Sequence, residues 1–153
     1  MNIIEYIQPV VNTISYKRII NELKNFEYDY KLFIQENGYL LEFKLNNHLI
    51  KIIFSNNYPF KPPSKLFINS INSTDIYKLI MKLNPEIKEC LCCQSYLYDN
   101  NWYPLITIKN DILYEINLII KYKIYYFYKK LLKQIISKYT DQDMSYLNNY
   151  LLN

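Results

Sequence analysis

Hydrophobic and polar residues alternate along the first half of this chain with two different periods. From Ser15 to Phe26, apolar residues recur every three or four positions with charged residues opposite, which predicts an amphipathic helix. Asn37-Gly38 and, more weakly, Asn46-Asn47 are turn signals further along the chain. They separate runs of β-forming residues within a set of four: Tyr30–Gln35, Tyr39–Leu45, His48–Phe54 and Lys65–Asn69. The pattern predicts a helix followed by a four-stranded antiparallel meander.

The segment after the third run has a different character. Pro59, Pro62 and Pro63 remove backbone donors and fix φ, so this stretch is predicted to be a loop. Asp75–Leu83 suits a short helix, which Ser73 or Thr74 could cap at its N-terminus. The segment between that helix and Trp102 has no sustained period, and we expect it to be an ordered loop.

A long helix is predicted after Pro104, where Thr107 or Asn110 can cap its first turn. A break near Thr140-Asp141 and a final short helix from about Met144 complete the pattern. The apolar stripe of the long helix comprises Ile112, Leu113, Ile116, Ile120, Ile124, Phe127, Leu131 and Ile135.

Length and charge set broad limits on what the protein can be. A chain of 153 residues, of which 50% are hydrophobic, is long enough for one compact domain, which we expect to span residues 1–153. The net charge of +4 is too small to indicate nucleic-acid binding. No stretch approaches the roughly 18 apolar residues of a membrane span, and Glu5 and Pro9 interrupt the apolar start. We expect a soluble protein of the cytoplasm, or also of the nucleus.

All three cysteines lie within one short segment, Cys90-Leu91-Cys92-Cys93. Three is an odd number, and adjacent cysteines bridge each other only with strain, so a disulfide scaffold is not expected. Reduced thiols are typical of the cytosol. A closed zinc site needs four ligands, which this chain could supply only by adding His48, its sole histidine, to three tightly spaced cysteines. We therefore expect neither a structural metal nor a cofactor.

Two proline-containing segments flank the cysteines, and with the first helix they resemble the ubiquitin-conjugating enzyme family. The segment Tyr58-Pro59-Phe60-Lys61-Pro62-Pro63 matches the hallmark loop of that family, and Trp102-Tyr103-Pro104-Leu105-Ile106-Thr107-Ile108 is similar to its tryptophan segment. Tyr16–Leu23 looks like the first-helix pattern of the family. The resemblance implies its α+β fold for a core of about residues 15–120, with a helical extension over residues 121–153.

The resemblance also implies a reaction. Family members accept ubiquitin or a ubiquitin-like protein from an activating enzyme as a cysteine thioester, and pass it to a lysine or a ubiquitin ligase. We expect this chain to do so as a monomer, without binding nucleic acid or membrane. Cys90-Leu91 matches the Cys-Leu dipeptide of the family, Cys93 lies nearest its spacing from the tryptophan, and Cys92 remains a third choice. A thiol needs no adjacent base because it is intrinsically nucleophilic.

A second catalytic group is less clear from the resemblance. The family has His-Pro-Asn before its cysteine, with an asparagine that holds the loop or stabilises the oxyanion. Here the segment is Leu83-Asn84-Pro85, so Asn84 is the candidate for this role. Asp99, Asn100 or Asn101 could instead orient an incoming lysine.

In the family, the two proline loops and the start of the first helix form the surface that docks ligases. By resemblance, the partner-binding candidates here are Phe60, Pro104 and Leu105, flanked by Lys17 and Arg18. Rigid prolines lower the entropy lost when such side chains bind a partner. The alternative is that Phe60 and Leu105 fill gaps at the edge of the sheet.

Three other readings remain open. The departures from the family pattern would also suit a catalytically inactive variant that binds ubiquitin or a partner enzyme. A more remote reading is an RNA-binding domain that uses tyrosines and lysines. The basic helix after Ile120 is either a solvated face or a contact surface for an acidic protein or membrane.

Overall fold

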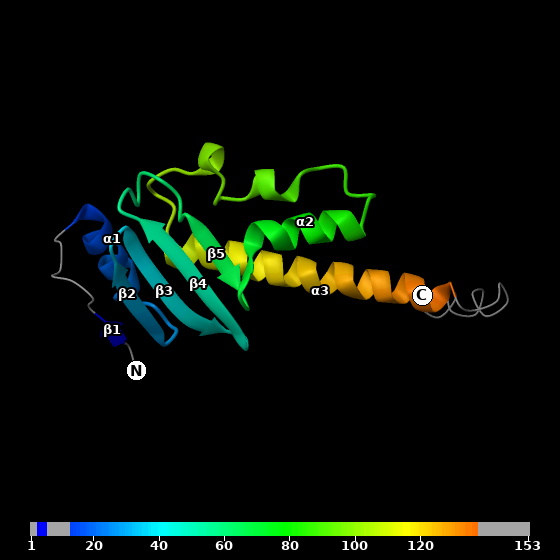
Figure 1. Cartoon of the computed structure of the whole chain (residues 1–153), viewed down its shortest axis with the longest axis horizontal. Coiled ribbons are helices and arrows are strands. Elements are labelled where there is room, and N and C mark those ends of the chain that lie inside the picture. The colour runs from blue at the N-terminus through cyan, green and yellow to red at the C-terminus, as the bar shows by residue number, and fades with distance from the viewer. Residues whose placement is uncertain (1–2, 6–12, 138–153) are drawn as a thin grey trace.

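The computed structural model describes residues 3–5 and 13–137 and has an α+β architecture (Figure 1). An N-terminal helix lies beside a sheet, and a long C-terminal helix crosses one face of that sheet and continues beyond it. The helices are α1 (Ile14–Leu23), α2 (Ser73–Leu83) and α3 (Leu113–Ile136). The strands are β1 (Ile3–Glu5), β2 (Tyr30–Gln35), β3 (Gly38–Leu45), β4 (His48–Ser55), β5 (Lys65–Ile68) and β6 (Ile71–Asn72).

Short helical turns complete the described part of the chain. The cysteine segment contains the 3-10 turns η1 (Leu91–Gln94) and η2 (Asp99–Asn101). A π-helical turn, η3 (Ile108–Ile112), leads into α3. The Thr107 side chain accepts a hydrogen bond from the Asn110 N–H, so Thr107, one of the two predicted cap residues, caps η3, the turn from which α3 continues.

The sheet contains more strands than the four predicted from the sequence. Within residues 3–5 and 13–137 it has six strands in chain order, with β2–β6 antiparallel and β1 parallel to β2. The four predicted strands are confirmed within one residue at each end. The prediction missed β1 and β6 because segments of three and two residues are too short to display a period. It also missed that Asn72, rather than Ser73 or Thr74, caps α2.

The turns between strands differ in which residues adopt positive φ. In the β3–β4 turn, Asn46 and Asn47 have φ values of 47° and 66°, as a two-residue hairpin loop of this hand requires. The β2–β3 turn is instead formed by Glu36 and Asn37, and Gly38 already pairs with Gln35 as the first residue of β3. Asn46-Asn47, the weaker turn signal in the sequence, therefore forms the turn in which both residues adopt the left-handed conformation.

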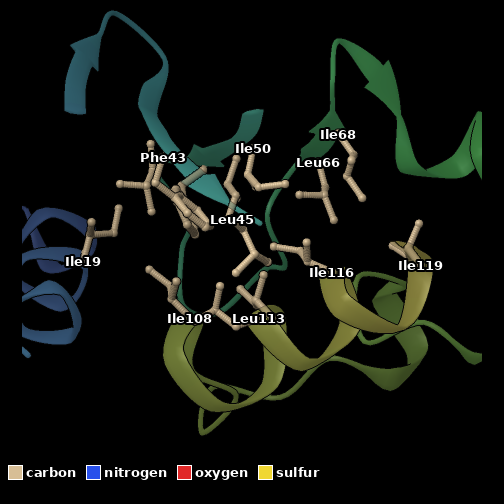
Figure 2. Close-up of a cluster of buried hydrophobic side chains, with 14 of the residues drawn as sticks. Ile19, Phe43, Leu45, Ile50, Leu66, Ile68, Ile108, Leu113, Ile116 and Ile119 are labelled. Atoms are coloured by element: carbon tan, nitrogen blue, oxygen red, sulfur yellow. The ribbon is translucent and has the colours of Figure 1, made fainter. Parts of the chain in front are cut away.

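The hydrophobic core lies between the sheet and the helices that cover it (Figure 2). Alternate residues of β3 face inward, because successive side chains of a strand point to opposite faces. Ile19 of α1 and Ile116 of α3 are fully buried against this face. Burying a side chain of this size contributes roughly 1.5–3 kcal/mol, so the core fixes both helices on the sheet.

The apolar stripe of α3 is buried only along its first half. Ile112, Leu113, Ile116 and Ile120 lie in the core, but the stripe residues beyond them are exposed: Ile124, Phe127, Leu131 and Ile135. The reason is that this part of α3 extends past the sheet (Figure 1). Within residues 3–5 and 13–137, no helix combines the length and hydrophobicity needed to cross a membrane. The break and the final helix predicted near Thr140 and Met144 lie outside the described residues.

We predict that replacing Gly38, the only glycine of the chain, by alanine strongly destabilises the protein. Gly38 has a φ of 150°, and a Cβ atom there would lie 1.9 Å from the Phe54 carbonyl oxygen. The free energy of unfolding of Gly38→Ala, measured by urea denaturation, should fall by about 3 kcal/mol or more. Asn37→Ala, in the adjacent exposed turn, is the control and should change it by less than about 0.5 kcal/mol. Equal stability of the two variants would contradict this account.

Candidate functional site

The three cysteines are brought together by a single turn of 3-10 helix. Cys90 precedes η1 as its cap residue, and its carbonyl oxygen accepts a hydrogen bond of 3.1 Å from the Cys93 N–H. The Sγ atoms of Cys90 and Cys92 lie 2.7 Å apart, and all three Sγ atoms lie within 4.8 Å of one another. The result is a cluster of three thiols, which we call the thiol cluster.

None of the three thiols is sealed inside the core. Cys93 is exposed, and Cys90 and Cys92 are half-buried. A nucleophilic cysteine must be reachable from solvent, so each sulfur meets this requirement to some degree. Cys92 also packs against the hydrophobic core, which makes it the least available of the three.

Hydrogen bonds within the cluster give the three thiols different pKa values. Hydrogen bonds from the Cys92 and Cys93 thiols, followed by one from the Cys93 N–H, lower the pKa of Cys90 to about 7. Each of the other two thiols donates to Cys90, and this hydrogen bond, followed by burial, raises the pKa of Cys93 to about 11 and also raises the pKa of Cys92. Two protonated thiols thus stabilise one thiolate, because hydrogen bonds to the charged form favour it.

The carbonyl groups of this segment are held by a side chain that follows it. The Asn101 Nδ2 atom donates to the Cys93 carbonyl oxygen at 2.7 Å and to the Ser95 carbonyl oxygen at 3.0 Å. Asp99 and Asn100 are exposed beside it. Of the three residues suggested to orient a lysine, Asn101 is therefore engaged in holding the cysteine segment.

A buried glutamate of α3, which the sequence analysis did not predict, anchors the same segment to α2 and α3. The Glu115 Oε1 atom accepts a hydrogen bond from the Tyr77 hydroxyl at 3.0 Å, and its Oε2 atom accepts one from the Tyr96 N–H at 2.9 Å. Burial, followed by the Glu115 carboxylate, raises the pKa of Tyr77, which keeps its hydroxyl protonated as the donor. The available signal was an acidic residue between Ile112 and Ile119, at helical spacing from both.

Asn84, the predicted oxyanion residue, lies at the end of α2. It is only 2% exposed, and its Nδ2 atom donates to the Ile80 carbonyl oxygen at 3.0 Å. Its backbone oxygen also accepts a hydrogen bond from the Ile87 N–H. These contacts give Asn84 a structural role where the chain leaves the helix, and its catalytic role stays a prediction.

The two proline loops are joined to each other through Trp102. The Trp102 Nε1 atom donates to the Pro59 carbonyl oxygen at 2.7 Å, and the indole lies against the Tyr58 ring with centroids 5.9 Å apart. Tyr58 is fully buried, and its hydroxyl donates to the Glu22 Oε1 atom at 2.9 Å. Trp102 therefore positions the loops in relation to each other and to α1.

Exposed hydrophobic side chains project from both loops. Phe60 is 65% exposed and Leu105 is 79% exposed, and Pro104 and Lys17 are exposed as well. The alternative that Phe60 and Leu105 fill gaps at the sheet edge is therefore wrong. We call Phe60, Pro104 and Leu105 the loop surface.

Arg18, the remaining partner-binding candidate, is engaged within the protein. Its Nε atom donates to the Glu22 carboxylate, and its Nη2 atom donates to the Ile106 carbonyl oxygen at 3.2 Å. Arg18 thus connects α1 to the second proline loop, residues 102–108, which we call the tryptophan loop. Lys17, on the exposed side of α1, keeps its charge available to a partner.

The order of thiol acidities leads to a prediction on pH dependence. The thiolate is the reactive form, so alkylation of Cys90 by iodoacetamide should rise with pH and reach half of its maximum near pH 7. In a Cys92→Ala/Cys93→Ala variant, Cys90 loses both thiol donors and the midpoint should move up toward about 8.5. Mass spectrometry of the Cys90 peptide gives the rate at each pH. A midpoint that is the same in both proteins would show that the neighbouring thiols do not lower the pKa of Cys90.

We also predict that Glu115→Ala loosens the cysteine segment. The substitution leaves the buried Tyr77 hydroxyl and the Tyr96 N–H without their acceptor, so the free energy of unfolding should fall by about 2–4 kcal/mol. Hydrogen exchange at the Tyr96 N–H should accelerate. Glu86→Ala, which removes exposed ion pairs with Lys129 and Lys133, serves as the control with little expected effect. Unchanged exchange at Tyr96 in Glu115→Ala would contradict the anchoring role.

Comparisons with known proteins do not assign this site. No family model, no curated protein and no solved structure matches the chain. A functional interpretation of the site is therefore based on the resemblance of its motifs and on the residues described above.

Proposed function

We propose that this protein is a ubiquitin-conjugating-type transferase that carries ubiquitin, or a ubiquitin-like protein, as a thioester on Cys90. The observation that carries the proposal is the position of the thiol cluster. It is accessible to solvent, and it lies in a segment braced at Glu115 and Asn101 and bounded by a loop that resembles the tryptophan loop of the family. Among the three thiols, Cys90 is favoured by its Cys-Leu dipeptide, and its pKa near neutrality agrees with this choice.

The proposed reaction consists of two acyl exchanges at sulfur. The Cys90 thiolate attacks the thioester carbonyl of the charged activating enzyme, so a new C–S bond forms and the thiolate of that enzyme leaves. A lysine amine of the substrate, or a cysteine of a ligase, then attacks the Cys90 thioester. The Cys90 thiolate leaves, and an attacking amine loses its proton to solvent. Neither step needs a nucleotide or a redox partner at this site, because thiolates are good nucleophiles and good leaving groups.

The loop surface supplies a docking site for the activating enzyme or a ligase. Its apolar side chains are exposed on a backbone that Pro59, Pro104 and the Trp102 hydrogen bond hold in place. A preorganised loop loses little conformational entropy on binding, which favours its use as an interface. The free thiols suit the reducing cytoplasm or nucleus, which is where we propose that the reaction takes place.

A catalytically inactive ubiquitin- or partner-binding module is the second candidate function. It is favoured by Asn84, the side-chain amide of which is used at the end of α2. The loop surface would serve such a module equally well, since docking needs no thiol. The two candidates therefore differ only in whether a thioester forms.

We predict that the protein forms a thioester when it is incubated with activating enzyme, ATP and ubiquitin. The adduct should be seen on a non-reducing gel and should disappear on addition of a thiol reductant. Cys90→Ser should give either no adduct or one that resists the reductant, because an oxygen ester is not cleaved by thiols. Cys93→Ser is the matched control, and it should retain a reductant-sensitive adduct.

The outcome against the transferase is equally specific. If the protein with all three cysteines intact forms no adduct, while a variant with serine at positions 90, 92 and 93 still binds ubiquitin or the partner enzyme, the binding module is the correct function. If a reductant-sensitive adduct persists in Cys90→Ser and is lost in Cys93→Ser, the transferase stands and the nucleophile is Cys93.

A further inference from the structure

We propose that the thiol cluster is a binding site for one soft, thiophilic metal ion, with Cu(I) as the ion that fits its ligands best. The site consists of the three sulfur atoms of Cys90, Cys92 and Cys93. The proposal does not rest on the transferase activity, because it concerns only the ligands and their geometry. It also differs from the four-ligand zinc site that the sequence argues against.

The three sulfurs of the cluster are near enough to one another to bind a single ion as a three-coordinate thiolate site. Metal–sulfur bonds to a d¹⁰ ion are about 2.3 Å long, so three sulfurs arranged symmetrically around one ion lie about 4 Å apart. In this structure, every pair of sulfur atoms is separated by no more than 4.8 Å. The Cys90 and Cys92 sulfurs lie 2.7 Å apart and must separate to about 4 Å when the ion binds, whereas the other separations need at most a small adjustment.

The backbone that carries the sulfurs is already ordered for binding. The Cys93 N–H to Cys90 carbonyl bond closes the turn, Asn101 holds the Cys93 carbonyl, and Glu115 holds the Tyr96 N–H just beyond it. Ligands on a preorganised turn lose less entropy when the ion binds than ligands on a flexible segment would. Cys93 is exposed and Cys90 and Cys92 are half-buried, so an ion can reach the cluster from solvent.

The ligand set selects for soft ions. Thiolates favour Cu(I) over hard ions such as Mg²⁺, which prefer oxygen ligands. In the described part of the chain, the cluster contains no histidine or carboxylate. His48 lies at the start of β4, where its Nδ1 atom is hydrogen-bonded to Asn69 Nδ2, and the nearby Glu89 carboxylate accepts a hydrogen bond from Gln94. Three ligands satisfy Cu(I), whereas a closed zinc site requires a fourth.

Binding has a direct chemical consequence for the proposed transferase. One Cu(I) and three thiols give a tris-thiolate complex with a charge of −2, and three protons are released. The Cys90 lone pairs are then shared with the metal, so the sulfur that would carry an acyl group is no longer free to attack. Metal binding and thioester formation are thus mutually exclusive at Cys90.

The experiment is an anaerobic competition between the purified protein and a chromophoric Cu(I) chelator. Transfer of Cu(I) to the protein lowers the absorbance of the chelator complex, and we expect one ion per chain with the protein still monomeric by size exclusion. Cys90→Ser, Cys92→Ser and Cys93→Ser should each weaken binding at least tenfold, because each removes one ligand. His48→Ala is the matched control, and its affinity should equal that of the parent.

A second measurement covers the case in which a cysteine variant fails to fold. In the parent protein, one equivalent of Cu(I) should protect all three thiols from iodoacetamide together, as read by mass spectrometry. No transfer from the chelator, protection of fewer than three thiols, half an ion per chain, or an unchanged affinity in Cys93→Ser would each overturn the site. Thioester formation with chelator present is measured separately, so loss of that activity leaves the metal result intact.

Discussion

The arrangement of the first helix, the proline loop and the start of α3 depends on the hydrogen bonds of the Glu22 carboxylate. Its two oxygens accept hydrogen bonds from the Tyr58 hydroxyl and, at 2.6 Å, from the Ile108 N–H, and it also pairs with Arg18. These partners belong to the first helix, the proline loop and the turn that leads into α3. A partly buried carboxylate is stable only when its oxygens are satisfied, so the same group that needs the three partners also brings them together.

This constraint explains why the loop surface and the thiol cluster are held on one framework. Tyr58 positions the proline loop from within the core, and Trp102 connects that loop to the tryptophan loop. Glu115 then connects α3 to the cysteine segment. Two buried or partly buried acidic side chains thus connect segments that also pack against the hydrophobic core.

Much of the fold was predictable because one face of the sheet is buried. Alternation of period two is strong when one face packs against a core, as in Leu41 and Phe43 of β3, so the four longer strands were located closely. The exposed end of α3 was not predictable, since Ile124 and Leu131 continue the same stripe that Ile116 and Ile120 begin. The period of the hydrophobic residues predicts a helix and its apolar face, but it does not predict where along the helix the sheet stops covering that face.

The candidate site was predictable in its location but not in its geometry. The flanking motifs place Cys90 and Cys93 in one segment, whereas their convergence arises from a 3-10 turn without a sequence signal. The position of Asn84 before the cysteines suggests an oxyanion role, but its side-chain amide donates to the Ile80 carbonyl oxygen at the end of α2. The sequence does not predict the role of Glu115, because an acidic residue in a long helix usually lies on the solvent side.

The single tryptophan of the chain has an optical consequence. Its indole is half-buried between the two proline loops, with its N–H bonded to Pro59 and its ring beside Tyr58. Indole emission shifts to longer wavelength when water reaches the ring. The fluorescence of the unlabelled protein therefore reports on whether the two loops remain joined, without any added dye.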